Sequence, residues 1–191
     1  LSDEVRQELL EFVSYYNAED TLDEDWVEER WYRQSGMGRS GIRKTWKDNG
    51  VAEELFQSLD NKDTRAFCAL IRGMANYLQI DRAWQLYQEA CEKNIALDTD
   101  TYNSLIRIAT YLREGSELRW QLIKDILTTV AEKSVTPNLG TLNSTLEALV
   151  HLGGWRQARD LSLQVLSEFR SIGIEPSLST YYHLLLIHCR E

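Results

Sequence analysis

Apolar residues recur at helical spacing along most of the chain, and one pattern of apolar and polar positions returns four times. The copies share an aromatic residue or Leu at the second position and Ile or Leu at the sixth, and they occupy residues 66–71, 101–106, 141–146 and 180–185. Equivalent positions are separated by 35, 40 and 39 residues, at Cys68, Asn103, Asn143 and Tyr182. A period of this size is typical of arrays in which each unit buries its apolar face against its neighbours. The pattern therefore predicts an all-α solenoid of helix-turn-helix units.

The same periodicity divides the chain into three parts. Ser2 is a suitable N-cap for an N-terminal helix over residues 1–17, and residues 18–50 are predicted to be an insertion or linker. The repeat array is predicted over 51–191. It comprises a half repeat, three whole repeats and the first helix of a further unit, over residues 51–63, 64–98, 99–138, 139–177 and 178–191. Strand signals are weak throughout the sequence, because sustained alternation of apolar and polar residues is missing, so no strands are expected.

The net charge of −9 is distributed unevenly along the chain. Residues 1–29 carry a charge of −10, residues 30–47 carry +6, and the remainder carries −5. Because the repeats themselves are mildly acidic, tight autonomous binding to RNA is not expected. The sequence contains no run of about 18 apolar residues, and we therefore expect no membrane partner.

The sequence offers no pattern typical of an enzyme. It lacks a glycine-rich phosphate loop, a nucleophile elbow and a pair of tuned carboxylates. His183, His188 and Cys189 have separations that do not share one helical face, which argues against a metal site. We therefore expect no catalytic residues, no metal and no cofactor.

The details of the repeat resemble the pentatricopeptide repeat family. The resemblance lies in the period, in the aromatic–Asn–small–Leu–Ile opening at 102–106, and in the Ile-x-Pro-Ser ending at 174–177. Further motifs resemble the branch of this family that belongs to the animal mitochondrial small ribosomal subunit, at residues 50–56, 70–74, 135–139 and 171–181. The resemblance implies a right-handed superhelical solenoid located in the mitochondrial matrix.

The resemblance also implies which residues read RNA. In this family each repeat reads one base, through a residue near the start of its first helix and the last residue of the repeat. The implied pairs are Cys68 with Asp98, Asn103 with Asn138, and Asn143 with Ser177, followed by Tyr182 alone. The asparagine pairs resemble combinations associated with pyrimidines, because a carboxamide offers both a donor and an acceptor. Cys68 offers neither well, so its repeat is expected to read poorly.

Basic side chains next to these positions are candidates for phosphate contacts. Arg72 and Arg107 lie one helical turn beyond reading positions, although both also fit an interpretation as ordinary exposed residues. The other candidates form a basic cluster before the array and are Arg39, Arg43 and Lys44.

One departure from the family weighs against sequence-specific reading. The aliphatic residues that normally wedge between bases are replaced by Arg65, Asp100, Gly140 and Ser179.

Taken with the resemblance, these features favour an RNA-associated structural component of the mitochondrial small ribosomal subunit that helps to position mRNA near the entrance. The implied partners are ribosomal RNA, single-stranded mRNA that includes pyrimidine-rich sequence, and other small-subunit proteins. Two alternatives remain open from the sequence. One is a free organellar factor for RNA maturation or stability, and the other is a helical scaffold that binds only protein.

Overall fold

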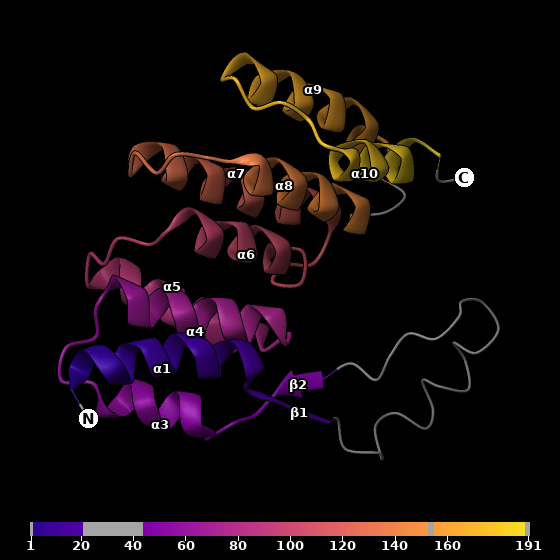
Figure 1. Ribbon diagram of the computed structural model, residues 1–191. Helices are drawn as coiled ribbons and strands as arrows, with labels where there is room; N and C mark the ends of the chain where they lie inside the picture. Colours follow the sequence, from indigo (N-terminus) through magenta and orange to yellow (C-terminus); the bar gives the residue numbers. More distant parts are fainter. Residues whose placement is uncertain (1, 21–43, 153–154, 190–191) are drawn as a thin grey trace.

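The chain folds into a stack of helix pairs (Figure 1). The structure is a computed structural model that describes residues 2–20, 44–152 and 155–189. The predicted phosphate contacts Arg39 and Arg43 lie outside the described residues, as does most of the acidic tract.

Two layers of helices build the stack. The first layer contains α1 (Asp3–Tyr16), α4 (Thr64–Asn76), α6 (Thr99–Ala109), α8 (Leu139–His151) and α10 (Leu178–His188). The second contains α3 (Val51–Ser58), α5 (Ile80–Glu92), α7 (Ser116–Glu132) and α9 (Gln157–Ser171). Each first-layer helix packs on the next one in the stack, and each second-layer helix packs on its partner in the first layer. The prediction of an all-α repeat solenoid is confirmed.

Two short strands depart from the prediction that strands are absent. β1 (Ala18–Asp20) pairs with β2 (Lys44–Trp46) in an antiparallel ladder, with Ala18 opposite Trp46. The prediction was wrong at this point because segments of three residues are too short to show alternation.

An ion pair between the buried Glu53 and the partly exposed Arg82 joins the end of this ladder to the helices. Arg82 donates to both carboxylate oxygens of Glu53 at 2.8 and 2.7 Å, and the indole N–H of Trp46 donates to Glu53 at 2.8 Å. Burial raises the pKa of Glu53, but the bonds from Arg82 and Trp46 outweigh it and hold the pKa below its usual value. Arg82 also donates to Asp48 at 2.6 Å. The network joins β2, α3 and α5.

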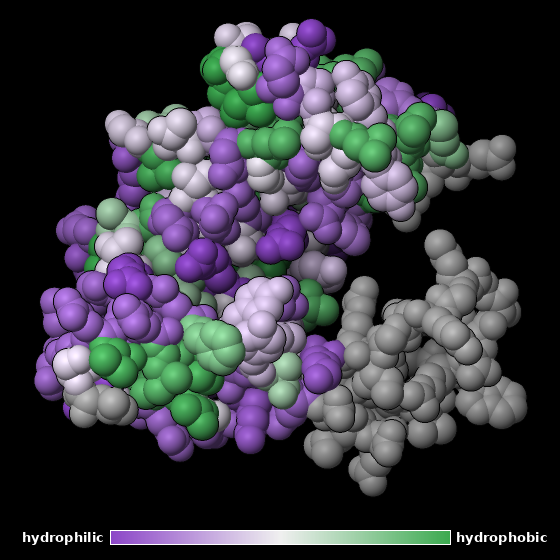
Figure 2. Space-filling view, in the orientation of Figure 1, coloured by the Kyte–Doolittle hydropathy of each residue, from purple (hydrophilic) through white to green (hydrophobic). Residues whose placement is uncertain are grey.

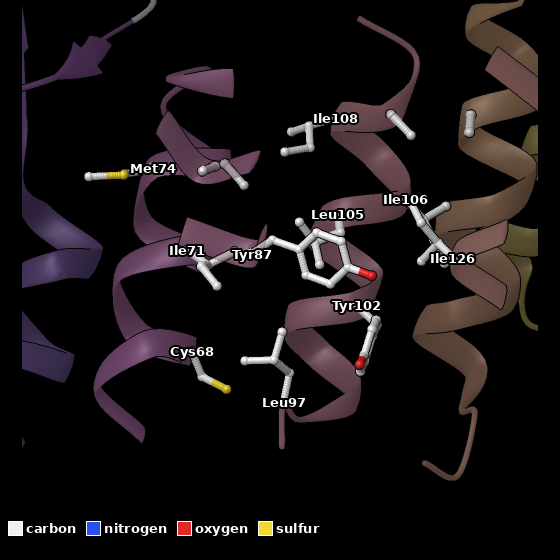
Figure 3. Close-up of a cluster of buried hydrophobic side chains, with 14 of the residues drawn as sticks. Cys68, Ile71, Met74, Tyr87, Leu97, Tyr102, Leu105, Ile106, Ile108 and Ile126 are labelled. Carbon is white, nitrogen blue, oxygen red and sulfur yellow. The ribbon is translucent and has the colours of Figure 1, made fainter. Parts of the chain in front are cut away.

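A continuous hydrophobic core runs between the two layers. Figure 3 shows its central part, where Ile71 of α4, Tyr87 of α5, Leu105 of α6 and Ile126 of α7 lie together. Burial of each large apolar side chain contributes about 1.5–3 kcal/mol. The core thus fixes the spacing of successive first-layer helices.

The connectors between repeats share one geometry. Helices α5, α7 and α9 are each followed, two positions after their last residue, by a residue with positive φ, namely Asn94, Ser134 and Gly173. The N–H of the following apolar residue returns to the last turn, from Ile95 to Ala90 O, Val135 to Val130 O and Ile174 to Phe169 O, at 2.8–3.0 Å. These bonds are those of a Schellman ending. Each connector therefore delivers the last residue of its repeat to the same place at the start of the next helix.

Candidate nucleic-acid interface

The last residue of each whole repeat caps the next helix. Side-chain oxygens of Asp98, Asn138 and Ser177 accept hydrogen bonds from the backbone N–H groups of Thr101, Thr141 and Thr180 at 2.8, 3.0 and 3.4 Å. Asp, Asn and Ser are favoured at this position because their oxygens satisfy the free N–H groups of the first turn. The capping bond holds each side chain beside the helix that carries the next repeat.

Each cap lies against the reading position of its own repeat. Cys68 Sγ accepts the Asp98 N–H at 3.4 Å, and Asn103 Nδ2 donates to Asn138 Oδ1 at 3.1 Å. Asn143 Nδ2 lies 3.5 Å from Ser177 Oγ, while Asn143 Oδ1 accepts from Thr180 Oγ1 at 2.7 Å. The structure thus brings together all three residue pairs that the sequence indicated, and their contact with RNA stays a prediction.

In the first whole repeat, the reading pair and its neighbouring arginine are engaged in contacts within the repeat. Cys68 is buried, and burial raises the pKa of its thiol, which therefore stays protonated at neutral pH. Arg72 Nη1 lies 3.7 Å from Asp98 Oδ2, and Arg72 Nε donates to the Cys68 carbonyl at 3.3 Å. The arginine predicted to meet phosphate is thus partly engaged within its own repeat.

The pair of the second whole repeat leaves one acceptor open. The Asn103 side chain is 7% exposed, and its Oδ1 has no hydrogen-bond partner in the part of the chain that the structure describes. Gly140 makes room for this arrangement, since a Cβ there would lie 2.8 Å from Asn103 Nδ2 and 2.9 Å from Asn138 Oδ1. A buried acceptor without a partner costs about 1–3 kcal/mol, and a ligand N–H would recover that cost.

A groove of about 450 Å³ runs between α1, α4 and α6. Asn103 lines it together with Arg72 and Arg107, and Glu11 and Asp100 contribute acidic groups to the same groove. Arg107 Nη2 donates to Ser104 Oγ at 3.3 Å, which orients its guanidinium within the groove. The groove therefore combines two cations that suit phosphate with two carboxylates that weaken the attraction.

A second hollow of about 360 Å³ brings the insertion to the array. Lys44 of β2 lines it beside Arg107, Tyr111, Glu147 and His151. The sequence placed Lys44 and Arg107 in separate regions of the chain, and the ladder carries Lys44 back to the first-layer helices. Three of the five predicted phosphate contacts, Arg72, Arg107 and Lys44, thus line two hollows that share Arg107.

Two family models match the chain. A model described as small ribosomal subunit protein mS39, PPR, matches residues 1–79, and a model of the PPR repeat family matches residues 62–109. The chain belongs to the pentatricopeptide repeat family. Membership agrees with the period, the helix pairs and the contacts between reading positions and caps.

Curated relatives of this pentatricopeptide chain carry the name small ribosomal subunit protein mS39. The Drosophila melanogaster protein is 45% identical over 100% of this chain and 29% of its own length. The Danio rerio protein is 31% identical over 98% of this chain and 30% of its own length. The Xenopus laevis protein is 36% identical over 76% of this chain and 22% of its own length. The chain spans less than a third of the length of these relatives.

A solved structure supports the pentatricopeptide fold. PPR10, crystallised with an 18-nt psaJ RNA element, superposes with a TM-score of 0.57 at 22% identity, covering 65% of this chain and 17% of PPR10. At this identity the likeness shows the fold alone.

The remaining predicted site residue lies at the end of the pentatricopeptide stack. Tyr182 on α10 is 58% exposed and contacts the ring of His183 edge-on. Sequence reasoning missed Glu11 and Tyr15 of α1, which line the groove with Arg72. Their spacing of four residues on one predicted helix was the available signal.

Among the described residues, no group of three His, Cys, Asp or Glu side chains is placed to hold a metal ion. None of the helices over those residues has the length and apolar character needed to cross a membrane.

Proposed function

We propose that the chain is an RNA-associated structural component of the mitochondrial small ribosomal subunit, in the matrix, where it helps to hold mRNA near the entrance. Its relatives are named small ribosomal subunit protein mS39, and the similarity extends over the whole chain. The proposal assigns it no catalytic residue and no cofactor.

One observation carries the RNA-binding part of this proposal. The reading positions and caps touch in three successive repeats, and Asn103 of the middle pair, whose Oδ1 has no partner among the described residues, lines a groove with Arg72 and Arg107. A single strand laid along the first-layer helices meets a hydrogen-bonding site for a base and cations for its phosphates in the same groove. Asn103 Oδ1 then accepts an N–H from the edge of a base.

The charge of the groove sets the strength of binding. Glu11 and Asp100 face the same space as the two arginines, and Glu147 lines the neighbouring hollow beside Lys44. On a single strand, each neutralised phosphate makes the plot of log binding constant against log salt concentration steeper by about 0.7. Because this groove offers few phosphate contacts, its binding to RNA is weak. The array therefore guides RNA, while contacts with ribosomal RNA and ribosomal proteins anchor it.

A specific observation supports a second candidate, a scaffold that binds protein alone. The side chains of Val5, Leu9 and Phe12 on α1 are 44%, 38% and 64% exposed, and Val51 of α3 is 54% exposed. Figure 2 shows the resulting apolar patch at the lower left, over α1 and α3. An apolar patch of this kind suits a protein surface better than RNA.

Binding of fluorescent single-stranded RNA at several salt concentrations tests the groove. We expect the wild-type chain to bind pyrimidine oligomers, with Asn103→Leu weakening binding about 3- to 10-fold through loss of a base contact. We expect Arg107→Gln to lower the logarithmic salt slope by about 0.7. Lys124→Gln, on the exposed side of α7, is the matched control and should change neither quantity. Absence of salt-sensitive RNA binding would favour the protein scaffold, whereas RNA binding that none of these substitutions alters would reject the groove as the binding site.

Sedimentation tests the ribosomal assignment separately. The natural protein is followed through sucrose gradients of mitochondrial lysate at low and high salt. Co-migration with the small subunit at both salt concentrations is the expected result. Migration as a light species, or release at moderate salt, would reject the ribosomal role and favour a free organellar RNA-binding factor.

A further inference from the structure

We infer that α1 and α3 are the two helices of one further RNA-reading repeat, split by the insertion, and that Gln7 is its base-contacting residue. This inference rests on the proposed function and extends it to a part of the chain where the sequence pattern is broken.

The packing of α1 is that of a first-layer helix. It lies against α4 as α4 lies against α6, and it also packs on α3, which takes the place of a second-layer helix (Figure 1). The two helices are far apart in sequence, ending at Tyr16 and beginning at Val51. In the neighbouring repeat the corresponding step runs only from Asn76 to Ile80.

The base of the insertion keeps the two helices in the geometry of a hairpin. Asn17, directly after α1, donates through Nδ2 to Lys47 O at 2.8 Å and accepts the Lys47 N–H on its backbone oxygen at 3.1 Å. The ladder continues this pairing from Ala18 and Trp46. The chain therefore leaves α1 and returns toward α3 at adjacent points, as it does at an ordinary turn between paired helices.

The register within α1 matches that of the other first-layer helices. The reading residue lies five positions after the N-cap in Asp63 to Cys68, in Asp98 to Asn103 and in Asn138 to Asn143. Ser2 is the N-cap of α1, with the same extended backbone, and five positions on is Gln7.

The next turn of α1 supports this register. Glu11 follows Gln7 by four residues, as Arg72 follows Cys68 and Arg107 follows Asn103, and all three of these following residues line the same groove.

Gln7 also has the chemical property that marks Asn103. Its side chain is 6% exposed, and within the described residues its Nε2 finds no hydrogen-bond partner. Gln7 and Asn103 thus occupy equivalent positions with an unpaired buried amide atom each, a donor in one and an acceptor in the other. Burying an unpaired donor is costly unless a ligand supplies the acceptor. Ring nitrogens and carbonyl oxygens on the edges of nucleobases are such acceptors.

The last residue of this split repeat is Asp63. It caps α4 by accepting the Ala66 N–H at 3.0 Å, the role that Asp98 has for α6. The split repeat therefore has two helices and a capping last residue, and it differs from the other repeats in the extended backbone of Leu59 after α3.

Gln7→Met tests the inference, because methionine keeps the length of the side chain and removes its polar atoms. We expect RNA affinity to fall about 3- to 10-fold while the free energy of unfolding stays equal or rises, since an unsatisfied buried donor has been removed. Because each repeat reads one base, we also expect the shortest oligonucleotide that reaches full affinity to shorten by about one nucleotide. Gln7→Glu, which keeps the shape and replaces the donor by an acceptor, should weaken binding as well.

Ser14→Ala is the matched control. Ser14 lies on the same helix, is 1% exposed, and has a hydroxyl without a partner among the described residues, but it does not occupy a reading position. The control should leave RNA affinity unchanged. If Gln7→Met binds like the wild type while Asn103→Leu is weakened, the split repeat is rejected and the proposed function stands. If neither substitution changes binding, both proposals fall.

Discussion

The first and second whole repeats share one backbone plan and differ in the chemistry of their reading pairs. The Asp98 N–H donates to Cys68 Sγ and Arg72 lies beside the Asp98 carboxylate, whereas Asn103 Oδ1 has no partner among the described residues. The two repeats also differ at the residue two positions after the cap, which is Asp100 in the first and Gly140 in the second. The comparison shows that the connector and cap set the geometry, while the side chains and the space beside them decide whether a repeat leaves a polar atom without a partner among the described residues.

The largest expected effect concerns what the two repeats have in common. Phe67 and Tyr102 occupy equivalent positions, and both are completely buried. We expect Phe67→Ala and Tyr102→Ala each to lower the free energy of unfolding by about 3–5 kcal/mol, because each leaves a large cavity in the core. Denaturant unfolding followed by circular dichroism measures this. Losses that differ widely between the two variants would contradict a shared scaffold.

Gly140→Ala fills the space beside the Asn103–Asn138 pair. The added Cβ would lie within 3 Å of both side chains of the Asn103–Asn138 pair, so we expect the pair to separate. Alanine favours the helix by about 1 kcal/mol over glycine, which offsets the strain and keeps the chain folded. RNA affinity should fall about 10-fold, as measured by fluorescence anisotropy. The control Gly173→Ala alters a connector, where nothing lies within 4 Å of the added Cβ, and should leave affinity unchanged while lowering stability.

The double substitution of Cys68→Asn with Asp98→Asn reverses the comparison by giving the first repeat the pair of the second. Asparagine is still able to cap α6, and removal of the Asp98 charge frees Arg72 for phosphate. We expect RNA affinity to rise about 3-fold, within the range of one added hydrogen bond. An unchanged affinity would show that Asp100 or the wider groove closes this repeat, whatever its reading pair.

The smallest effect concerns the hydroxyl that distinguishes Tyr102 from Phe67. Burial raises the pKa of Tyr102 to about 12, so the folded chain retains a proton that the unfolded chain loses near pH 10. Stability from this group is therefore intact below about pH 10 and falls as the pH rises from about 10 toward 12.

Tyr102→Phe should reduce that alkaline loss and change the unfolding free energy at pH 7 by less than about 1 kcal/mol. Unfolding curves at pH 7 and at alkaline pH measure both. Part of the loss should remain, because burial also raises the pKa of Tyr87. An alkaline loss identical to that of the wild type would show that Tyr102 does not titrate in this range.

Much of the array was predictable because its signals are local. The period located the first-layer helices. The residues expected to end the repeats are Asp98, Asn138 and Ser177, and in the structure they are the N-caps of α6, α8 and α10. The resemblance to the family implied Asn103 and Asn138 as a pair, and their side chains are in contact at 3.1 Å.

The N-terminal region was less predictable because its contacts are distant in sequence. The insertion separates α1 from α3, so the interval between them no longer matches the period of the other units. The position of Lys44 beside Arg107 depends on a ladder of three-residue strands, and the unpaired atom of Gln7 becomes visible only when its burial is known.

The ion-pair network around Trp46 and Glu53 has a consequence for how the molecule can change. Because the ladder and this network hold Asp20 and Lys44 at neighbouring points, the sequence between them can be exchanged or lengthened without shifting the register of any helix. The array thus has a site that tolerates insertions, where evolution or an engineer can add a binding function while the repeats keep their order.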